Sequence, residues 1–339
     1  SSSSTASPAT GCSRRRPYLC DGSMDKRQHR TVYLGHADST FSVHFIAALD
    51  KMFPGGLKLV FIDEQEGLPF PGQPGFWLRS VRAFIELRRR LHHRAAQFYW
   101  SVYAMMRGHA VFFTGEDRYQ ELFKFLDDCD YLVTAGLRHR LPERSFANVQ
   151  KRAINFHYGP LPQYRGTHPV FWQRAHREKT FGYCFHLLSP GLDEGDVLFR
   201  AFLPVDPGLT DAKTGDLLTR HAALNLPRVL NAETQAVPQD RRHANHYRES
   251  DYLRYIAIDG CKWQEAWERM AQMPGRYLLD DRYIIHLKKS AHATGPEGLG
   301  CINGKILLRC GGRDVEIERV NYLPAMFYFW PLKKIFDVR

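Results

Sequence analysis

The sequence predicts an α/β fold, a doubly wound parallel sheet followed by a small β-rich domain. Between residues 31 and 188, short apolar runs of strand type alternate with stretches of helical periodicity, the pattern of βαβ units. After residue 252 alternating strands dominate, and Asn303-Gly304 separates two apolar runs as in a β-hairpin. These observations favour a parallel sheet with ligands at the carboxyl ends of its strands.

The elements of the sheet are predicted in chain order. Residues 31–35 form a first strand, and residues 41–52 form a helix with Phe41, Phe45, Ile46 and Leu49 on one side. The run 57–62 is uniformly apolar and follows a Pro-Gly-Gly turn, so it is a fully buried strand. The remaining elements are strands at 109–114 and 131–133, a helix at 119–126, a fifth strand that ends at Asn155-x-His157, and a sixth strand at 181–188.

A long amphipathic helix, or a pair of helices, is predicted for residues 77–106. Its apolar positions are Val81, Phe84, Ile85, Leu91, Ala95, Phe98 and Val102, and the basic residues between them are Arg82, Arg88, Arg89, Arg90, His92, His93 and Arg94. One interpretation is an arm that binds anions or RNA. The other is a surface helix whose arginines extend over the edge of the core.

The length, apolar content and cysteine spacing of the chain argue against a membrane protein and against a protein held together by disulfides or zinc. The 339 residues, 44% of them hydrophobic, suffice for two domains. No apolar run approaches the roughly 20 residues of a membrane span, so we expect no membrane partner. The seven cysteines are scattered and form no Cys-x-x-Cys pair, which indicates neither a zinc site nor a disulfide framework. We therefore expect a reduced, cytoplasmic protein without a metal ion.

Residues 1–30 are rich in serine and then basic, which is typical of a disordered leader or tag, or of an organellar transit peptide. This segment has six basic and two acidic residues, so it accounts for +4 of the net charge of +11. The remaining +7 favours anionic partners such as folyl glutamates, phosphorylated substrates or RNA. DNA is not an expected partner.

Three polar residues stand where the chain must turn. Asn155 and His157 are two residues apart on a strand, so both side chains face the same side. The loop Gly159-Pro160-Leu161-Pro162-Gln163-Tyr164-Arg165-Gly166 follows, and Asp193 lies in a second turn, Gly191-Leu192-Asp193-Glu194-Gly195-Asp196. An amide that binds an oxyanion, a histidine that moves a proton and a carboxylate that orients it suit acyl transfer. Asp196 is the alternative carboxylate.

These motifs resemble the folate-dependent formyltransferases. The similarity lies in Asn155-x-His157, in Leu161-Pro162-Gln163-Tyr164-Arg165-Gly166, in Leu192-Asp193-Glu194-Gly195, and in Ala135-Gly136-Leu137 with Leu141-Pro142. Gly159-Pro160 departs from the Ser-Leu that the family usually has. The resemblance implies a Rossmann-like catalytic domain, a C-terminal open β-barrel-like domain, and 10-formyltetrahydrofolate as formyl donor.

The resemblance also implies the residues of the site. Asn155, His157 and Asp193 would be catalytic, and the residues expected at the folate are Leu137, Arg138, His139, Arg140, Leu141, Leu188, Leu192 and Glu194. The catalytic domain is expected at 31–234, a linker at 235–251 and the C-terminal domain at 252–330.

The acceptor is expected to be the amine of a small molecule, such as an amino sugar, a hydroxylated amino acid or a natural-product intermediate. His168 and the pair Phe171-Trp172 after the proline loop look more like the small-molecule enzymes of the family. The alternative acceptor is initiator methionyl-tRNA, which the positive net charge of the chain favours. In a different class, water as acceptor would make the chain a formyltetrahydrofolate deformylase.

Overall fold

The structure is a computed structural model that describes the backbone of residues 30–63, 76–115, 122–126, 129–137, 140–206, 209–231 and 233–256, and of five strands at 276–279, 283–292, 298–302, 305–310 and 313–322. The predicted leader up to residue 29 lies outside these ranges, as do Arg138 and His139.

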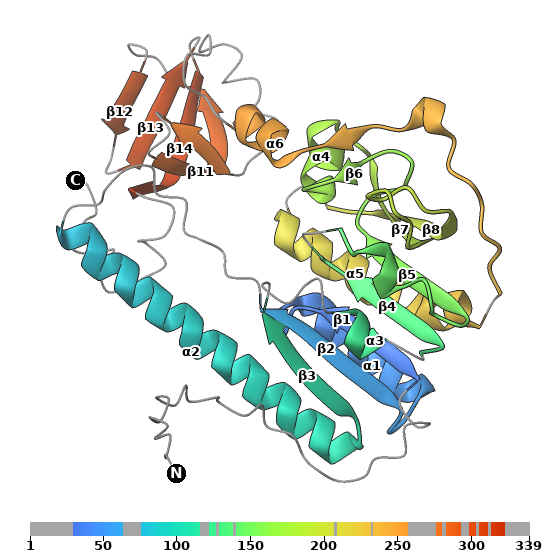
Figure 1. The fold of residues 1–339 in the computed structure, drawn as a ribbon. Helices are drawn as coiled ribbons and strands as arrows, with labels where there is room; N and C mark the ends of the chain where they lie inside the picture. Colours follow the sequence, from blue (N-terminus) through green and yellow to red (C-terminus); the bar gives the residue numbers. More distant parts are fainter. Residues whose placement is uncertain are drawn as a thin grey trace, which may run out of the picture.

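The described chain is built on a seven-stranded sheet (Figure 1). Its strands lie in the order β3 (Ala110–Gly115), β2 (Leu57–Asp63), β1 (Thr31–Gly35), β4 (Tyr131–Ala135), β5 (Arg152–His157), β7 (Thr180–Leu187) and β8 (Val197–Pro204). The first five pair in parallel, as predicted. The sixth predicted strand, β7, is antiparallel to β5 instead, since the chain turns back at the carboxyl end of β5 without crossing the sheet. β8 is antiparallel to β7 in turn.

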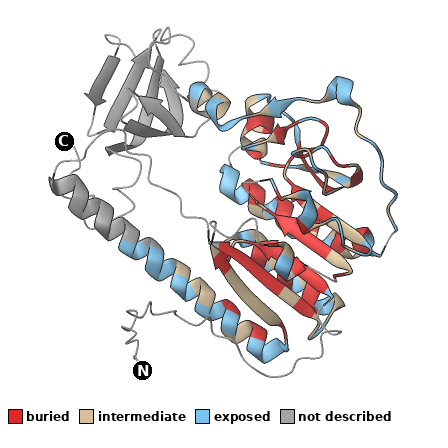
Figure 2. Cartoon of the chain, viewed as in Figure 1, coloured by how far each residue is buried: buried red, intermediate tan, exposed pale blue. Residues whose placement is uncertain are grey.

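Helices bury both faces of this sheet because its strands are apolar on both sides. On β1, Tyr33 packs into the core formed with α1 (Thr40–Met52) and α5 (Asp211–Leu230). Its neighbours Val32 and Leu34 point to the opposite face, where they meet Leu122 and Leu126 beside α3 (Phe123–Leu126). The burial colours of Figure 2 follow this layering.

The long helix is a single element, α2 (Phe76–Arg107), which confirms the helical prediction for 77–106. It lies along the edge strand β3 (Figure 1). The smaller elements are the 3-10 turns η2 (Glu143–Ser145) and η3 (Arg241–His243), the two-residue strands β6 (Arg165–Gly166) and β9 (His246–Tyr247), and the helices α4 (Pro169–Ala175) and α6 (Glu249–Ile256).

A second sheet follows, as the alternating pattern predicted. It is antiparallel, in the order β10 (Arg276–Leu279), β11 (Tyr283–His292), β14 (Arg313–Tyr322), β13 (Lys305–Cys310) and β12 (Gly298–Ile302). Ile302 pairs with Lys305, so β12 and β13 form the predicted hairpin. Closure into a barrel stays a prediction. No helix in the described part of the chain has both the length and the apolarity to cross a bilayer.

Candidate active site

The antiparallel pairing of β5 and β7 brings Asn155 opposite His186. Nδ2 of Asn155 lies 3.1 Å from Nε2 of His186, and Thr134 on β4 donates its hydroxyl hydrogen to Oδ1 of Asn155 at 2.8 Å. His186 uses Nδ1 to donate to the carbonyl oxygen of Leu187 at 2.8 Å, so its Nε2 is an acceptor in the neutral ring. The Asn155 amide is therefore held with its NH₂ group toward His186, and its second N–H remains for another acceptor.

His157 lies two residues further along β5 and is buried beneath the proline loop. Its Nε2 is 2.6 Å from the carbonyl oxygen of Tyr164, so Nε2 carries the hydrogen of the neutral ring. Nδ1 then presents its lone pair to Oδ2 of Asp193, 3.6 Å away. His157 is not among the residues that line the cavity described below, and it reaches the site through Asp193.

Asp193 is fixed by its backbone as well as by its carboxylate. It has a left-handed conformation with φ of 53°, which is uncommon for a residue other than glycine and is often found at functional sites. The backbone N–H of Gly166 donates to Oδ2 at 2.9 Å, and Nε2 of His186 lies 3.6 Å from Oδ1. Gln239 donates to the carbonyl oxygen of Asp193 at 2.9 Å. The carboxylate thus lies between two histidines, on a loop whose backbone is fixed by the hydrogen bond from Gln239.

Glycine is required where the proline loop meets Asp193. Gly166 has φ of +90°, and a Cβ atom there would lie 2.1 Å from the carbonyl oxygen of Tyr247. The close approach arises because β6 pairs with β9, which joins Gly166 to Tyr247. Residues of the predicted linker therefore support the loop that contacts Asp193.

Burial and charge act in opposite directions on the two titrating groups. Burial alone would raise the pKa of Asp193. Attraction to the His157 ring, which is protonated at the low pH where Asp193 titrates, outweighs burial together with contacts to His186 and the Gly166 N–H, and the pKa lies well below the usual value of 3.8. Burial lowers the pKa of His157 below 6.5, and the nearby Asp193 carboxylate opposes this shift only in part. At neutral pH the pair is an ionised carboxylate beside a neutral imidazole that can accept a proton.

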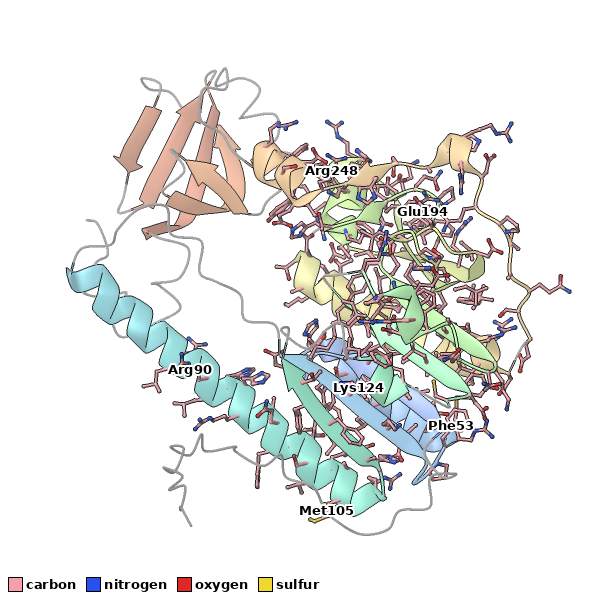
Figure 3. The ribbon with its side chains drawn as sticks, viewed as in Figure 1. Phe53, Arg90, Met105, Lys124, Glu194 and Arg248 are labelled. Atoms are coloured by element: carbon pink, nitrogen blue, oxygen red, sulfur yellow. The ribbon has the colours of Figure 1, made fainter. Side chains whose placement is uncertain are left out.

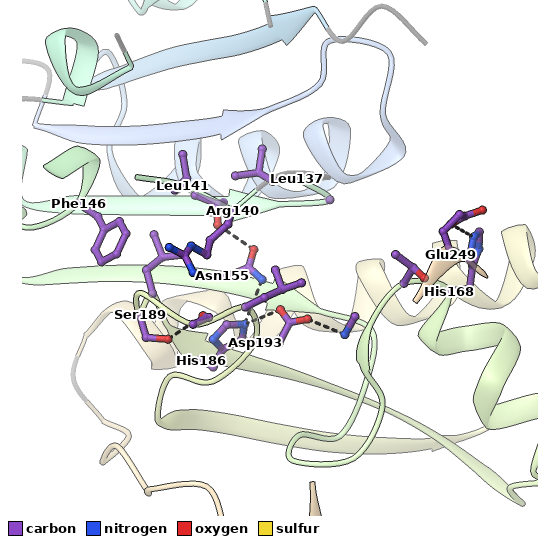
Figure 4. Close-up of a pocket in the computed structure, with 17 residues that line it drawn as sticks. Leu137, Arg140, Leu141, Phe146, Asn155, His168, His186, Ser189, Asp193 and Glu249 are labelled. Carbon is purple, nitrogen blue, oxygen red and sulfur yellow. Dashed lines mark hydrogen bonds and ion pairs between the residues drawn. The ribbon is translucent and has the colours of Figure 1, made fainter. Parts of the chain in front are cut away.

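These polar groups open into a cavity of about 630 Å³ (Figure 4). Asn155, His186 and Asp193 lie together in the close-up, with Ser189 beside them. Apolar side chains line the cavity from two loops, and they are Leu137, Leu141 and Phe146 after β4 and Leu188 and Leu192 after β7. His168 and Glu249 lie at the other end, 2.8 Å apart as an ion pair.

Most of the residues expected at the folate line this cavity. Leu137, Arg140, Leu141, Leu188 and Leu192 do so, whereas Arg138 and His139 lie outside the described residues. Glu194 is not among the lining residues, and its carboxylate is 3.7 Å from Nη1 of Arg165. Asp196 is not a lining residue either, and its carbonyl oxygen accepts from the N–H of Leu187. In the described part of the chain, no group of three His, Cys, Asp or Glu side chains is arranged to hold a metal ion.

Three residues of the cavity were not predicted from the sequence, and they are His186, Thr134 and Phe146. His186 lies seven residues before Asp193 on a predicted strand, but its role follows from the antiparallel register that faces it toward Asn155. Thr134 likewise becomes relevant only through its pairing with Asn155. The sequence signal that could have identified His186 and Thr134 is that each is a polar residue within an otherwise apolar strand.

The profile of the family described as "Formyl transferase" matches residues 113–230, which contain Asn155, His157, His186 and Asp193. This part of the chain is similar to the formyl transferase family. The chain is 36% identical to the methionyl-tRNA formyltransferase of Heliobacterium modesticaldum over 166 residues, 46% of this chain and 51% of that protein. It is 25% identical to the methionyl-tRNA formyltransferase of Citrifermentans bemidjiense over 212 residues, 58% of this chain and 67% of that one. The chain thus spans about half the length of the first of these formyltransferases.

Among solved structures, the fold is similar to that of the N-formyltransferase from Helicobacter canadensis, solved in complex with folinic acid and dTDP-3-aminofucose. The TM-score is 0.54, the identity is 13%, and the match covers 85% of this chain and 98% of that formyltransferase. The similarity confirms the Rossmann-like α/β fold that the resemblance implied.

Proposed function

We propose that this protein is an N-formyltransferase that uses 10-formyltetrahydrofolate as donor and the amine of a small molecule as acceptor. The observation that carries the proposal is the buried Asp193 carboxylate between His157 and His186, next to the oriented amide of Asn155. These groups meet at one end of a cavity whose wall is otherwise apolar. The match of residues 113–230 to the formyl transferase family supports the same chemistry.

The cavity suits the donor in size and character. A volume of about 630 Å³ is within the usual range for small-molecule sites. Leu137, Leu141 and Leu188 would pack against the flat pterin ring, and the exposed Arg140 is available to a glutamate carboxylate. When bound, 10-formyltetrahydrofolate supplies the one-carbon unit as an N-formyl group.

Asn155 would stabilise the formyl oxygen. Attack of an amine on a formyl carbon puts negative charge on that oxygen, and a fixed neutral N–H donor stabilises this charge. The free N–H of Asn155 fits the role because Thr134 and His186 already fix the orientation of the amide. No rotation of the amide is then needed as the charge develops.

Asp193 and His157 would remove the proton of the attacking amine. Asp193 is ionised and lines the cavity, so it can accept a hydrogen bond from the amine. As the amine becomes positively charged, its proton can pass to Asp193. Asp193 can then pass the proton on to the Nδ1 lone pair of His157, which lies on the side of the carboxylate away from the cavity. The carboxylate also stabilises the imidazolium that would result. The bond between the formyl carbon and N10 of the donor would then break, and the proton taken from the amine would pass to N10 of the departing tetrahydrofolate.

The far end of the cavity favours a small acceptor. Glu249 places a carboxylate on the rim, paired with His168, and His168 stacks on Tyr252 with ring centroids 3.9 Å apart. The paired imidazole and carboxylate, with the aromatic ring of Tyr252 beside them, offer hydrogen-bonding and stacking partners to the hydroxyl groups of a sugar or amino acid.

Initiator methionyl-tRNA is the second candidate acceptor. The specific observation in its favour is that the curated relatives, at 25–36% identity, are methionyl-tRNA formyltransferases. The net charge of +11 also suits RNA. A tRNA acceptor predicts binding that weakens steeply with salt, with a log–log slope of about −0.9 per phosphate contact on duplex RNA.

Formation of tetrahydrofolate from 10-formyltetrahydrofolate would be measured with and without amines, and the product would be identified by mass spectrometry. We expect turnover only with an acceptor amine. Equal turnover without one would assign the chain to the deformylases. Tight, salt-sensitive binding of initiator tRNA, together with formylation of its methionine, would establish the second candidate.

A further inference from the structure

Helix α2 has one buried face, toward the sheet. Trp100 and Ala104 are almost fully buried there, and Nε1 of Trp100 donates to the carbonyl oxygen of Ala37 at 2.7 Å. Tyr103, which directly precedes Ala104, donates its hydroxyl hydrogen to Asp50 of α1 at 3.0 Å. This face accounts for the attachment of the helix to the domain.

A second apolar face points away from the domain. Leu91, Phe98 and Met105 follow one another at intervals of seven residues, and they are 58%, 71% and 76% exposed. At 3.6 residues per turn they form one row on the side of the helix opposite Trp100. Figure 2 shows exposed residues along the outer side of α2, and Figure 3 marks Arg90 and Met105 on this helix.

The row belongs to a repeat that spans almost the whole helix. Steps of four and three residues alternate without interruption from residue 77 to residue 105. The positions are Trp77, Val81, Phe84, Arg88, Leu91, Ala95, Phe98, Val102 and Met105. All but Arg88 are apolar, and the flanks add Leu87, Tyr99 and Met106, each more than half exposed. We call these nine positions the α2 seam.

Such a seam has the pattern of one helix of a coiled coil. Apolar residues at alternating steps of three and four face a partner helix and insert between its side chains. A helix that only covers a sheet needs no such row on its solvent side. Large exposed apolar rows on soluble domains mark interaction sites.

We propose that α2 pairs with α2 of a second copy of this chain, as an antiparallel two-helix coiled coil about a two-fold axis near residue 93. In this register Leu91 of each copy faces Ala95 of the other, so a large residue meets a small one. Arg88 faces Phe98, so the single charge on the seam meets an aromatic ring and can form a cation–π contact. The paired segment from residue 81 to residue 105 would be about 37 Å long, at about 1.5 Å per residue.

The charges of the helix favour this direction over a parallel pair. A parallel pair would put Arg88 against Arg88 within the seam, where like charges repel. The antiparallel register separates the two Arg88 side chains by about 15 Å, the rise of ten residues. A lipid surface would not select the alternation of steps or a small residue at Ala95. RNA binding depends on neutralising phosphates with basic side chains, and Arg88 is the one basic residue among the nine positions of the seam.

Sedimentation velocity on the full chain tests the pairing. We expect a dimer for the parent protein, and for Leu91→Glu/Phe98→Glu a dissociation constant raised about 100-fold or more, since two-fold symmetry counts each change twice. Leu224→Glu is the control, because Leu224 on α5 is a 79% exposed apolar residue away from the seam. A monomeric parent, or equal dimers for all three proteins, would overturn the proposal.

Cysteine cross-linking tests the direction. Leu91→Cys/Ala95→Cys is expected to give disulfide-linked dimers above the background of the parent protein, whereas Met105→Cys alone is expected to give none. Met105 cross-links would indicate a parallel pair and contradict the register. A melting temperature lowered by Leu91→Glu/Phe98→Glu in dilute, monomeric protein would mean that the chain itself covers the seam. Loss of binding to anionic vesicles or tRNA by a monomeric protein would assign the seam to those partners instead.

Discussion

Nδ1 of His157 and Oδ2 of Asp193 lie 3.6 Å apart, and both side chains are buried. The distance is too long for a hydrogen bond but short for an unscreened charge interaction. Because Nε2 of His157 donates to Tyr164, the lone pair at Nδ1 is directed toward the carboxylate. Protonation of His157 would therefore be stabilised by the Asp193 carboxylate. Acyl transfer to an amine releases a proton that could protonate His157 in this way.

Replacing the carboxylate tests this arrangement. We expect Asp193→Asn to lower kcat by about two to four orders of magnitude, the range of general acid–base contributions, because the amide cannot accept the proton. Asp196→Asn is the matched control, since Asp196 is three residues away and does not line the cavity. Steady-state kinetics would measure kcat for both variants and show which carboxylate the reaction requires. Near-normal activity in Asp193→Asn with loss in Asp196→Asn would mean that the other carboxylate is the functional one.

His157→Gln is expected to retain folate binding but to lose most turnover, by a similar factor. The wall proposed to bind folate is formed by other residues, and His157 does not line the cavity. Fluorescence titration with a folate analogue measures the first property, and single-turnover kinetics measure the second. A variant that binds folate and turns over within a few-fold of the parent would show His157 to be a packing residue.

The pH dependence of the reaction follows from the same residue. Burial lowers the pKa of His157 below 6.5, so the rate is expected to fall on the acid side with a midpoint below 6.5, as His157 becomes protonated and can no longer accept a proton. The unfolded chain binds a proton at this histidine more readily, so stability also falls as the pH drops from about 6.5 toward the lower, folded pKa. The kcat profile and urea unfolding at several pH values separate the two effects. An acid limb above pH 7 would contradict this assignment.

Thr134→Val is expected to lower kcat about tenfold with little change in stability. The substitution keeps the shape but removes the hydroxyl that orients the Asn155 amide, so the amide can turn. Asn155→Ala, which removes the donor itself, is expected to cost about 100-fold or more. Thermal unfolding provides the control for folding. Equal activity of Thr134→Val and the parent would show that His186 alone orients the amide.

A cluster far from the cavity makes a prediction about stability. Asp50 accepts from Tyr103 at 3.0 Å, from Nε of Arg107 at 2.8 Å and from Nε2 of His109 at 2.8 Å. These contacts outweigh burial and lower the pKa of Asp50. We expect Asp50→Asn to lower the free energy of unfolding by about 2–4 kcal/mol, because it removes the charge partner of a buried network. Urea unfolding measures this, and a change below 0.5 kcal/mol, about the effect of a surface substitution, would contradict it.

Much of the sheet was predictable because its signals are local. The uniformly apolar run 57–62 and the periodicity of 77–106 each identify an element, and β2 and α2 match them within one residue. The direction of β7 was not predictable, since it depends on where the proline loop turns the chain back. That direction also decides that His186 meets Asn155, so this contact depended on long-range pairing.

The motif residues themselves were predictable for a different reason. Asn155 and His157 share a strand, and Asp193 lies in a short turn, so spacing alone indicated a common pocket. Arg140 and Leu141 were expected beside it and line it. Phe146 and Ser189 carry no signal of this kind, because they contact the cavity only through the course of their loops.

The pairing of β6 with β9 limits how this chain can be divided. Gln239 holds the backbone of Asp193, Asn245 accepts from the N–H of Tyr164 at 2.5 Å, and Tyr247 closes over Gly166. A fragment ending at residue 234 would retain every side chain proposed to be catalytic, but it would lose these three supporting contacts. Deletion analysis and domain exchange therefore need a cut point after α6, since a shorter fragment would be inactive although it carries the complete motif.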